Sequence, residues 1–137
     1  MPTQTSAAYD AANAYRTLGT YARSFDVPVD AVVTAGTDDL KCLVVKAGET
    51  VLDVMVTPIG DMDTGAAALR FEVGDSAASD TYVAAFDPGA GTGAVFRADA
   101  NLGKQYTADD YILLTAAIAA TTPAAGTVRV TVLLQAA

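Results

Sequence analysis

Alternation of apolar and polar side chains over residues 50–76 is the feature that most constrains the fold of this chain. Two runs place an apolar residue at every second position: Leu52, Val54 and Val56, then Leu69, Phe71 and Val73. Successive side chains of a strand point to opposite faces, so this period of two predicts two strands, each with one apolar face. The polar segment 58–65 connects them. Because two strands cannot bury their faces alone, the rest of the chain must supply further strands.

Strand-like segments recur along the chain at intervals of about ten residues, separated by turn-forming Gly, Pro and Asp. Eight strands are predicted, at 27–34, 40–46, 51–57, 65–73, 81–86, 94–98, 111–119 and 128–134. The short connection 47–49 predicts that the second and third of them form a hairpin. No helix is predicted after residue 24. The pattern predicts an all-β domain, a β-sandwich of jelly-roll or related Greek-key type with about eight antiparallel strands.

The last predicted strand carries the most regular pattern. Every second residue in it is apolar: Val128, Val130, Val132 and Leu134. This period of two predicts one fully buried face and a central place in the sheet. The preceding segment 111–119 is rich in Ile and Leu and lies between turn signals, so it is predicted to be a buried strand and not a helix.

Residues 1–24 differ from the rest of the chain and are predicted to form an N-terminal arm, with the β-sandwich domain over residues 25–137. Tyr9, Tyr15 and Tyr21 recur every six residues among Ala, Asn, Thr and Ser. This spacing gives no apolar stripe wide enough to dock a helix on the domain. We expect an extended arm with at most a turn or two of helix. The alternatives are a disordered tail and an arm that lies on a partner, with the tyrosines as amphipathic anchors.

The charge balance argues against several classes of partner. Sixteen acidic residues against eight basic ones give a net charge of −8, and the basic residues never cluster along the sequence. Binding to phosphate groups needs concentrated positive charge, so direct binding to nucleic acid or to anionic lipid is not expected. No apolar run reaches the length of about 18 residues that suggests a transmembrane helix, and no signal peptide is recognised. We therefore expect a protein made in the cytosol and no contact with a membrane.

The sequence offers little for catalysis. It has no histidine, which removes the commonest general base, the usual zinc ligand and every Ser-His or Cys-His nucleophile pair. Cys42 is the only cysteine and is interpreted as a small core residue among Val and Leu neighbours. A pair of carboxylates could serve a glycosidase, but Asp53 and Glu72, which lie within predicted strands, are expected on the solvated faces. We expect no enzyme activity, no cofactor and no metal.

Three loops resemble ligand sites only in part. The glycine-rich run 89–93 is followed by a predicted strand, whereas a phosphate-binding loop needs a helix after it. Asp61 and Asp63 in one loop, and Asp75 and Asp80 in another, could offer oxygen ligands to calcium. Neither loop has the spacing of an EF-hand. Asp75 and Asp80 are instead expected to cap turns.

Two stretches of the sequence resemble small virion proteins of tailed bacteriophages. The run AGETVLDVMVTPIGDMDTGAAALRFEVGDSAASDTYVAAF (47–86) is similar to their pattern of a strand, a polar loop and a second strand that ends in Gly-Asp. The C-terminal run YTADDYILLTAAIAATTPAAGTVRVTVLL (106–134) is similar to the hairpin that ends those proteins. The motifs are framework residues and turn formers, and the chain looks most like a capsid decoration, or cement, protein.

This resemblance implies a non-enzymatic structural role in a virion. Proteins of this kind sit on the outer capsid surface, often as homo-trimers, and lay a terminal arm across neighbouring subunits of the major capsid protein; they are assembled in the host cytoplasm. The residues expected to contact the capsid are those of the arm: Tyr9, Tyr15, Arg16 and Tyr21. The alanine-rich composition, without Trp, independently favours association, because the core per residue is thin.

Two other functions fit the sequence. One is a different structural role in the virion, in the tail, a spike or a fibre base. The other is a carbohydrate-binding β-sandwich, which predicts aromatic side chains grouped on one face or set of loops. The candidates for such a group are Tyr82, Phe86, Phe96, Tyr106 and Tyr111.

Overall fold

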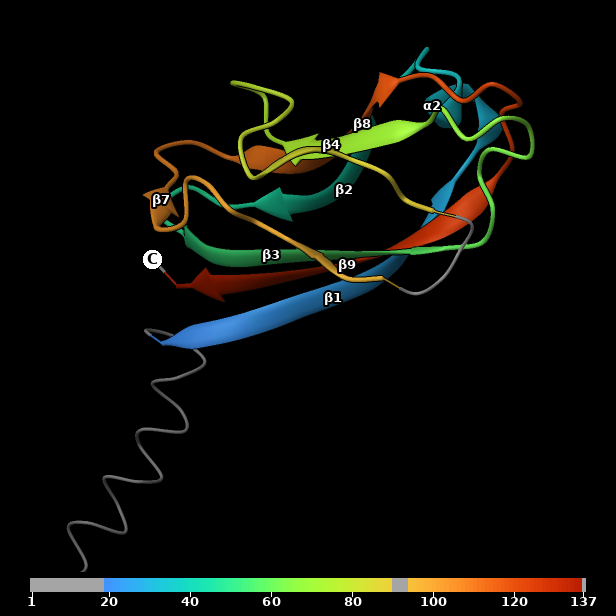
Figure 1. Cartoon of the computed structure of the whole chain (residues 1–137). Helices are drawn as coiled ribbons and strands as arrows, with labels where there is room; N and C mark the ends of the chain where they lie inside the picture. Colours follow the sequence, from blue (N-terminus) through green and yellow to red (C-terminus); the bar gives the residue numbers. More distant parts are fainter. Residues whose placement is uncertain (1–18, 90–93, 137) are drawn as a thin grey trace, which may run out of the picture.

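Two antiparallel sheets pack face to face in the computed structural model, which describes residues 19–89 and 94–136 (Figure 1). The first sheet has the strand order β1 (Thr20–Val29), β9 (Gly126–Gln135), β3 (Thr50–Ile59) and β6 (Phe96–Arg97), with β7 (Lys104–Gln105) also paired to β3. The second sheet has the order β2 (Leu40–Val45), β8 (Asp110–Ile118), β4 (Arg70–Gly74) and β5 (Val83–Phe86). The predicted all-β sandwich is confirmed, with nine strands in the described residues.

The strand order is that of a jelly roll. Each strand of the first half of the chain pairs with one of the second half: β1 with β9, β2 with β8, β3 with β6 and β7, and β4 with β5. The chain therefore forms a long antiparallel ribbon that turns back between β4 and β5. Because successive strands of the ribbon alternate between the two sheets, the ribbon is rolled into a sandwich.

The predicted hairpin between segments 40–46 and 51–57 is wrong. The corresponding strands, β2 and β3, lie in different sheets. The connection between them is bonded to a distant segment, since Gly48 N–H donates to the carbonyl of Tyr106 and Tyr106 N–H donates to the carbonyl of Glu49. Strand β3 instead pairs along its length with β9. The regular apolar alternation of β9 offers β3 a longer matching apolar face than β2 does.

The core lies between the sheets and uses the predicted apolar faces with one exception. Val128, Val130, Val132 and Leu134 of β9 are buried, as are Val54 and Val56 of β3 and Phe71 and Val73 of β4. The exception is Leu52, which is only partly buried, whereas Val51 is buried. A β-bulge between Val51 and Asp53 shifts the register by one residue, so the inward position passes from Leu52 to Val51.

The first strand begins earlier than the sequence predicts. Strand β1 covers Thr20–Val29, and segment 31–34, predicted to continue a strand, is the short helix α2 (Ala31–Thr34). Asp30 caps this helix, because its Oδ1 atom accepts a hydrogen bond of 3.0 Å from Val33 N–H. Residues 20–24, predicted as part of the arm, form the first half of β1 and pair with β9. Residues 1–18 of the predicted arm lie outside the described residues.

The segment that pairs with β3 on the side away from β9 forms two short strands, β6 and β7. The predicted strand 94–98 corresponds to the two-residue strand β6, and the predicted polar connection that follows contains β7, which pairs with the start of β3. The predicted strand 111–119 is confirmed as β8. No helix of the described residues is long and apolar enough to cross a membrane.

Replacing Val130 by Asp should unfold the domain or nearly so. Val130 is 1% exposed and stands between Phe25 of β1 and Val56 of β3, so a carboxylate there would be buried without a partner. We expect a loss of about 3 kcal/mol or more in the free energy of unfolding, measured by denaturant titration. Thr127→Asp, on the opposite face of the same strand, is the matched control and should lose far less. Equal losses in the two variants would contradict the placement of the core.

Candidate functional site

The structure places one of the four residues that were predicted to contact a capsid. Tyr9, Tyr15 and Arg16 lie outside the described residues. Tyr21 lies in β1 opposite Leu134 of β9, and its half-buried side chain packs against the core. Tyr21 therefore belongs to the β-sandwich, where its aromatic ring stabilises the sheet, and it is not part of an arm that precedes the domain.

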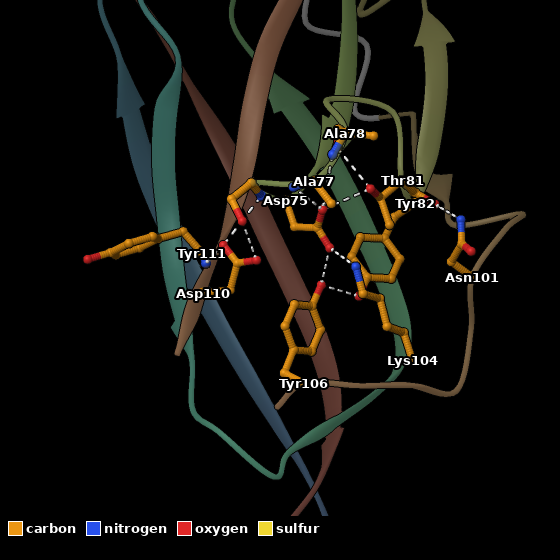
Figure 2. A network of polar contacts seen from close by, with 11 residues as sticks. Asp75, Ala77, Ala78, Thr81, Tyr82, Asn101, Lys104, Tyr106, Asp110 and Tyr111 are labelled. Carbon is orange, nitrogen blue, oxygen red and sulfur yellow. Dashed lines mark hydrogen bonds and ion pairs between the residues drawn. The ribbon is translucent and has the colours of Figure 1, made fainter. Parts of the chain in front are cut away.

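A cluster of buried polar groups surrounds Asp75, at the end of the sandwich where β1 begins and β9 ends (Figures 1 and 2). Asp75 follows β4, and its side chain is fully buried. Its Oδ1 atom accepts hydrogen bonds from Ala77 N–H at 3.0 Å, Ala78 N–H at 3.3 Å and the Thr81 hydroxyl at 3.0 Å. These bonds close the loop between β4 and β5, so the expectation that Asp75 caps a turn is confirmed.

The second carboxylate oxygen of Asp75 binds side chains from a distant segment. Lys104 of β7 donates from Nζ to Oδ2, and the Tyr106 hydroxyl donates to the same oxygen at 2.6 Å. The hydroxyl groups of Tyr106 and Tyr82 are hydrogen-bonded to each other. Asn101 Nδ2 also donates to the carbonyl of Thr81 at 2.6 Å (Figure 2). The Asp75 network thus joins the loop between β4 and β5 to the segment that contains β7.

The protonation states in the Asp75 network are fixed around neutral pH. Burial opposes ionisation of Asp75, but hydrogen bonds from Lys104, Tyr106 and Thr81 outweigh it and lower the pKa of the carboxyl to about 2. Burial raises the pKa of the Tyr82 hydroxyl to about 12. Burial and the hydrogen bond to Asp75 raise the pKa of Tyr106 well above its usual value. A general acid or base needs a pKa near the working pH, so the Asp75 network suits a structural role.

Asp63 has the corresponding role at the opposite end of the sandwich. Its two oxygens accept hydrogen bonds from the backbone N–H groups of five residues in two loops: Gly65, Ala68, Leu69, Thr121 and Thr122. The bond from Thr122 contributes most to holding the pKa of the carboxyl well below its usual range. This carboxylate therefore ties the loop between β3 and β4 to the loop between β8 and β9.

A depression of about 200 Å³ beside Asp63 is also lined by Asp61 and Asp87. The oxygens of Asp63 are already occupied by the backbone donors, and Arg70 lies 3.6 Å from Asp87. In residues 19–89 and 94–136 no group of His, Cys, Asp and Glu has an arrangement that could hold a metal ion. Burial raises the pKa of the Cys42 thiol to about 12, so the reactive thiolate does not form near neutral pH.

The two candidate catalytic carboxylates, Asp53 and Glu72, lie on the outer faces of different sheets. Asp53 projects from β3 in the first sheet and pairs with Arg97, whereas Glu72 projects from β4 in the second sheet and accepts a hydrogen bond from Ser79. A glycosidase needs two carboxylates that flank one bond of the substrate. These two side chains lie on opposite sides of the sandwich and do not meet this requirement.

The aromatic residues that were candidates for binding sugar do not gather on the surface. Tyr82, Phe86 and Tyr106 are buried, and Phe96 is half-buried and stacked on Phe86 with ring centroids 4.3 Å apart. Tyr111 is exposed, with Lys41 Nζ 4.3 Å from its ring centroid. A single exposed ring beside a lysine does not form the aromatic platform that a carbohydrate-binding sandwich requires.

The partners of Asp75 were not predicted from the sequence. Lys104 and Tyr106 lie about thirty residues further along the chain, and their segment was predicted to be an ordinary polar connection. The one available signal was Gly74 directly before Asp75. A Cβ atom at Gly74 would lie 2.0 Å from the carbonyl oxygen of Ala78, so only glycine lets the loop fold back closely enough for Asp75 to cap it.

Chains of three phage capsids share the fold of this protein. The similarity to a chain of the capsid asymmetric unit of cyanophage Pam1 has a TM-score of 0.75 at 24% identity and covers 88% of this chain and 87% of that one. A chain of the capsid of Ralstonia phage GP4 has a TM-score of 0.70 at 21% identity, and the match covers 86% of this chain and 84% of that one. A chain of the acid-stable capsid of Helicobacter pylori bacteriophage KHP30 has a TM-score of 0.58 at 12% identity, and the match covers 83% of this chain and 86% of that one. No protein-family model and no curated protein matches the chain.

Replacing Asp75 by Asn should destabilise the domain in a pH-dependent way. The variant loses the charge that Lys104 and Tyr106 bind, and we expect it to lose about 3 kcal/mol of unfolding free energy at pH 7. Because folding lowers the pKa of Asp75, its contribution is complete above the unfolded pKa of about 4 and disappears as the pH falls towards about 2. Denaturant titrations at several pH values should show the two proteins converging in this range.

The exposed Asp80 in the same loop provides the control. Asp80→Asn should change the unfolding free energy little at any pH. A constant difference between wild type and Asp75→Asn from pH 7 down to pH 2 would contradict the account of the Asp75 network.

Proposed function

We propose that this protein is a non-enzymatic structural component of a tailed-phage virion, a capsid decoration or cement protein. In this role it binds the outer surface of the capsid as a homo-trimer and stabilises the contacts between neighbouring subunits of the major capsid protein. It needs no cofactor for this function and does not touch the packaged nucleic acid or a membrane.

The observation that carries the proposal is the shared fold with chains of three phage capsids. The matches cover more than four-fifths of this chain and of each capsid chain, so they concern the whole β-sandwich and not one motif. Shared folds host unrelated functions in general, which is why the chemistry of the surface must agree as well.

The chemistry of the described residues agrees with a structural role. The buried carboxylates Asp75 and Asp63 bind loops together, and their low pKa values keep them ionised around neutral pH. The outer face of the first sheet carries cross-strand ion pairs between Asp26 and Arg129 and between Asp53 and Arg97, as a hydrated surface would. A net charge of −8 is compatible with the outside of a capsid, away from the packaged genome.

The segment before β1 is the proposed capsid clamp. Residues 1–18 precede β1 and carry Tyr9, Tyr15 and Arg16, which supply aromatic area and a planar cation, two features common in protein interfaces. Tyr21 was grouped with them from the sequence, but it packs against the core and is proposed to anchor the start of β1. Contacts of this segment with the capsid would add to the affinity of the sandwich for it.

A different place in the virion, such as the tail, a spike or a fibre base, is the main alternative. Binding to isolated capsid shells separates the two roles, because a tail component should leave shells unlabelled. A glycan array tests the carbohydrate-binding alternative, for which the buried aromatic residues give no support.

Deletion of residues 2–18 should leave a folded domain that no longer binds capsid shells. The deletion ends before β1 starts at Thr20, so the sheet stays intact, whereas deletion up to Ser24 would remove half of its edge strand. Binding is measured by co-sedimentation with shells of the phage that lack the protein, and folding by circular dichroism. Binding equal to that of the full chain would contradict the clamp.

Point variants refine the deletion experiment. Tyr9→Ala combined with Tyr15→Ala should weaken binding by at least about tenfold while the thermal midpoint stays unchanged. Tyr21→Ala is the matched control and should lower the thermal midpoint, because it removes a ring that packs against the core. The opposite assignment of the two effects would show that the capsid contact lies in β1.

A further inference from the structure

Strand β1 lies at one edge of the β1–β9–β3–β6 sheet and is ten residues long (Figure 1). Among residues 19–89 and 94–136 it pairs with β9 alone, through ten consecutive residue pairs without a register shift. A long and regular edge strand presents a row of N–H and C=O groups to which another strand can bind.

The other sheet edges in the described part of the chain are protected against such pairing. Strands β6 and β7 have two residues each, and β5 has four residues and a register shift in its pairing with β4. The β2 edge also has a register shift, between Lys41 and Leu43, and its Val44 carbonyl accepts a hydrogen bond of 2.8 Å from Arg23 Nη1. Short strands, bulges and covering side chains are common means of blocking an edge, so β1 is the edge that these devices leave open.

The direction of each backbone group of β1 follows from one hydrogen bond. Ala136 N–H donates to the carbonyl of Gly19 at 3.0 Å, and these two residues stand opposite each other when the register of β1 and β9 is extended by one pair. Directly opposed residues of antiparallel strands alternate between pairs that exchange hydrogen bonds and pairs that do not. The odd-numbered residues of β1 therefore bond to β9. The even-numbered ones direct their N–H and C=O groups away from it: Thr20, Ala22, Ser24 and Asp26.

Pro28 agrees with this assignment and limits the length of the open edge. It is also even-numbered, so the N–H group that proline lacks is one that β9 would not bind. An incoming strand finds no donor at this position. We call residues 20–27, which precede it, the open edge.

The side chains of the open edge leave room for a strand. Ala22 and Ser24 are small and exposed, and the charge of Asp26 is balanced by its ion pair with Arg129. On the other face of β1, which is turned towards the second sheet, the Phe25 ring is 44% exposed. A strand beside the open edge can cover this ring with an apolar side chain, whereas its other face needs only small or polar residues.

We propose that the open edge binds an extended segment of a major capsid subunit as an additional strand of the sheet. Main-chain hydrogen bonds to the even-numbered residues hold this strand, and an apolar side chain packed on Phe25 sets its register. The position of the edge indicates the partner. Residues 1–18, the proposed capsid clamp, lead directly into β1, so a subunit bound by the last residues of the clamp lies beside Thr20. The inference rests on the proposed function, because its partner is a capsid subunit.

Amide hydrogen exchange, measured residue by residue on the full chain alone and on capsid shells that lacked the protein, tests the inference. The N–H groups of the odd-numbered residues of β1 should exchange slowly in both states. Those of the even-numbered residues should exchange fast in the free chain and at least about tenfold more slowly on shells. Shell binding that leaves them fast would overturn the inference and not the proposed function, whereas a chain that does not bind shells would overturn both.

Two other occupants of the open edge give different results, and either would overturn the inference. If the even-numbered N–H groups are slow in the free chain and become fast when residues 2–18 are deleted, the chain covers its own edge. If they become slower as the concentration of the free chain rises, a second copy covers it.

Proline at an even-numbered position tests the same contact through affinity. Ser24→Pro removes one N–H of the open edge and no hydrogen bond to β9, so it should stay folded by circular dichroism and weaken shell binding about tenfold. Ser24→Ala is the matched control. It keeps this N–H and loses only the hydroxyl group, which is hydrogen-bonded to Thr131, and it should bind shells as the wild type does. Equal binding by the two variants would contradict the added strand. If Ser24→Pro does not fold, the exchange experiment on the wild-type chain decides.

Discussion

Burial of one face of β9 is the interaction on which the rest of the structure depends. Val128, Val130, Val132 and Leu134 are each at most 1% exposed, and β9 pairs along its length with β1 on one side and β3 on the other. A strand with two neighbours and one covered face fixes the register of both neighbours, because a slip of one residue would turn its valines to solvent. The second sheet then follows, since it must cover this face.

The apolar faces of the strands could be predicted from the sequence, but their partners could not. The alternation in β9 and the run in β8 identify buried strands directly. Pairing was predicted from short connections, which in a jelly roll carry the chain between sheets, as the separation of β2 from β3 shows. The bulge that moves Val51 into the place of Leu52 has no signature in the sequence, and neither has the two-residue strand β7.

In the candidate site, too, contacts that are local in the sequence could be predicted, whereas contacts between distant segments could not. Asp75 was predicted as a turn cap because Asp bonds to backbone two or three residues ahead, and it does so. Its ion pair with Lys104 depends on the packing of two remote segments. Tyr21 shows the reverse case: the tyrosine repeat along the sequence grouped it with the arm, whereas the structure places it in β1. The two carboxylates Asp75 and Asp63 hold the loops in place at opposite ends of the sandwich.

Electron cryo-microscopy of the phage particle with this protein bound would show directly whether the protein lies on the capsid. We expect ordered density for the jelly roll on the outer surface of the capsid, over the junctions between major capsid subunits, with the segment before β1 running onto those subunits. Capsids without such density, with the protein found on the tail or on no part of the particle, would contradict this expectation.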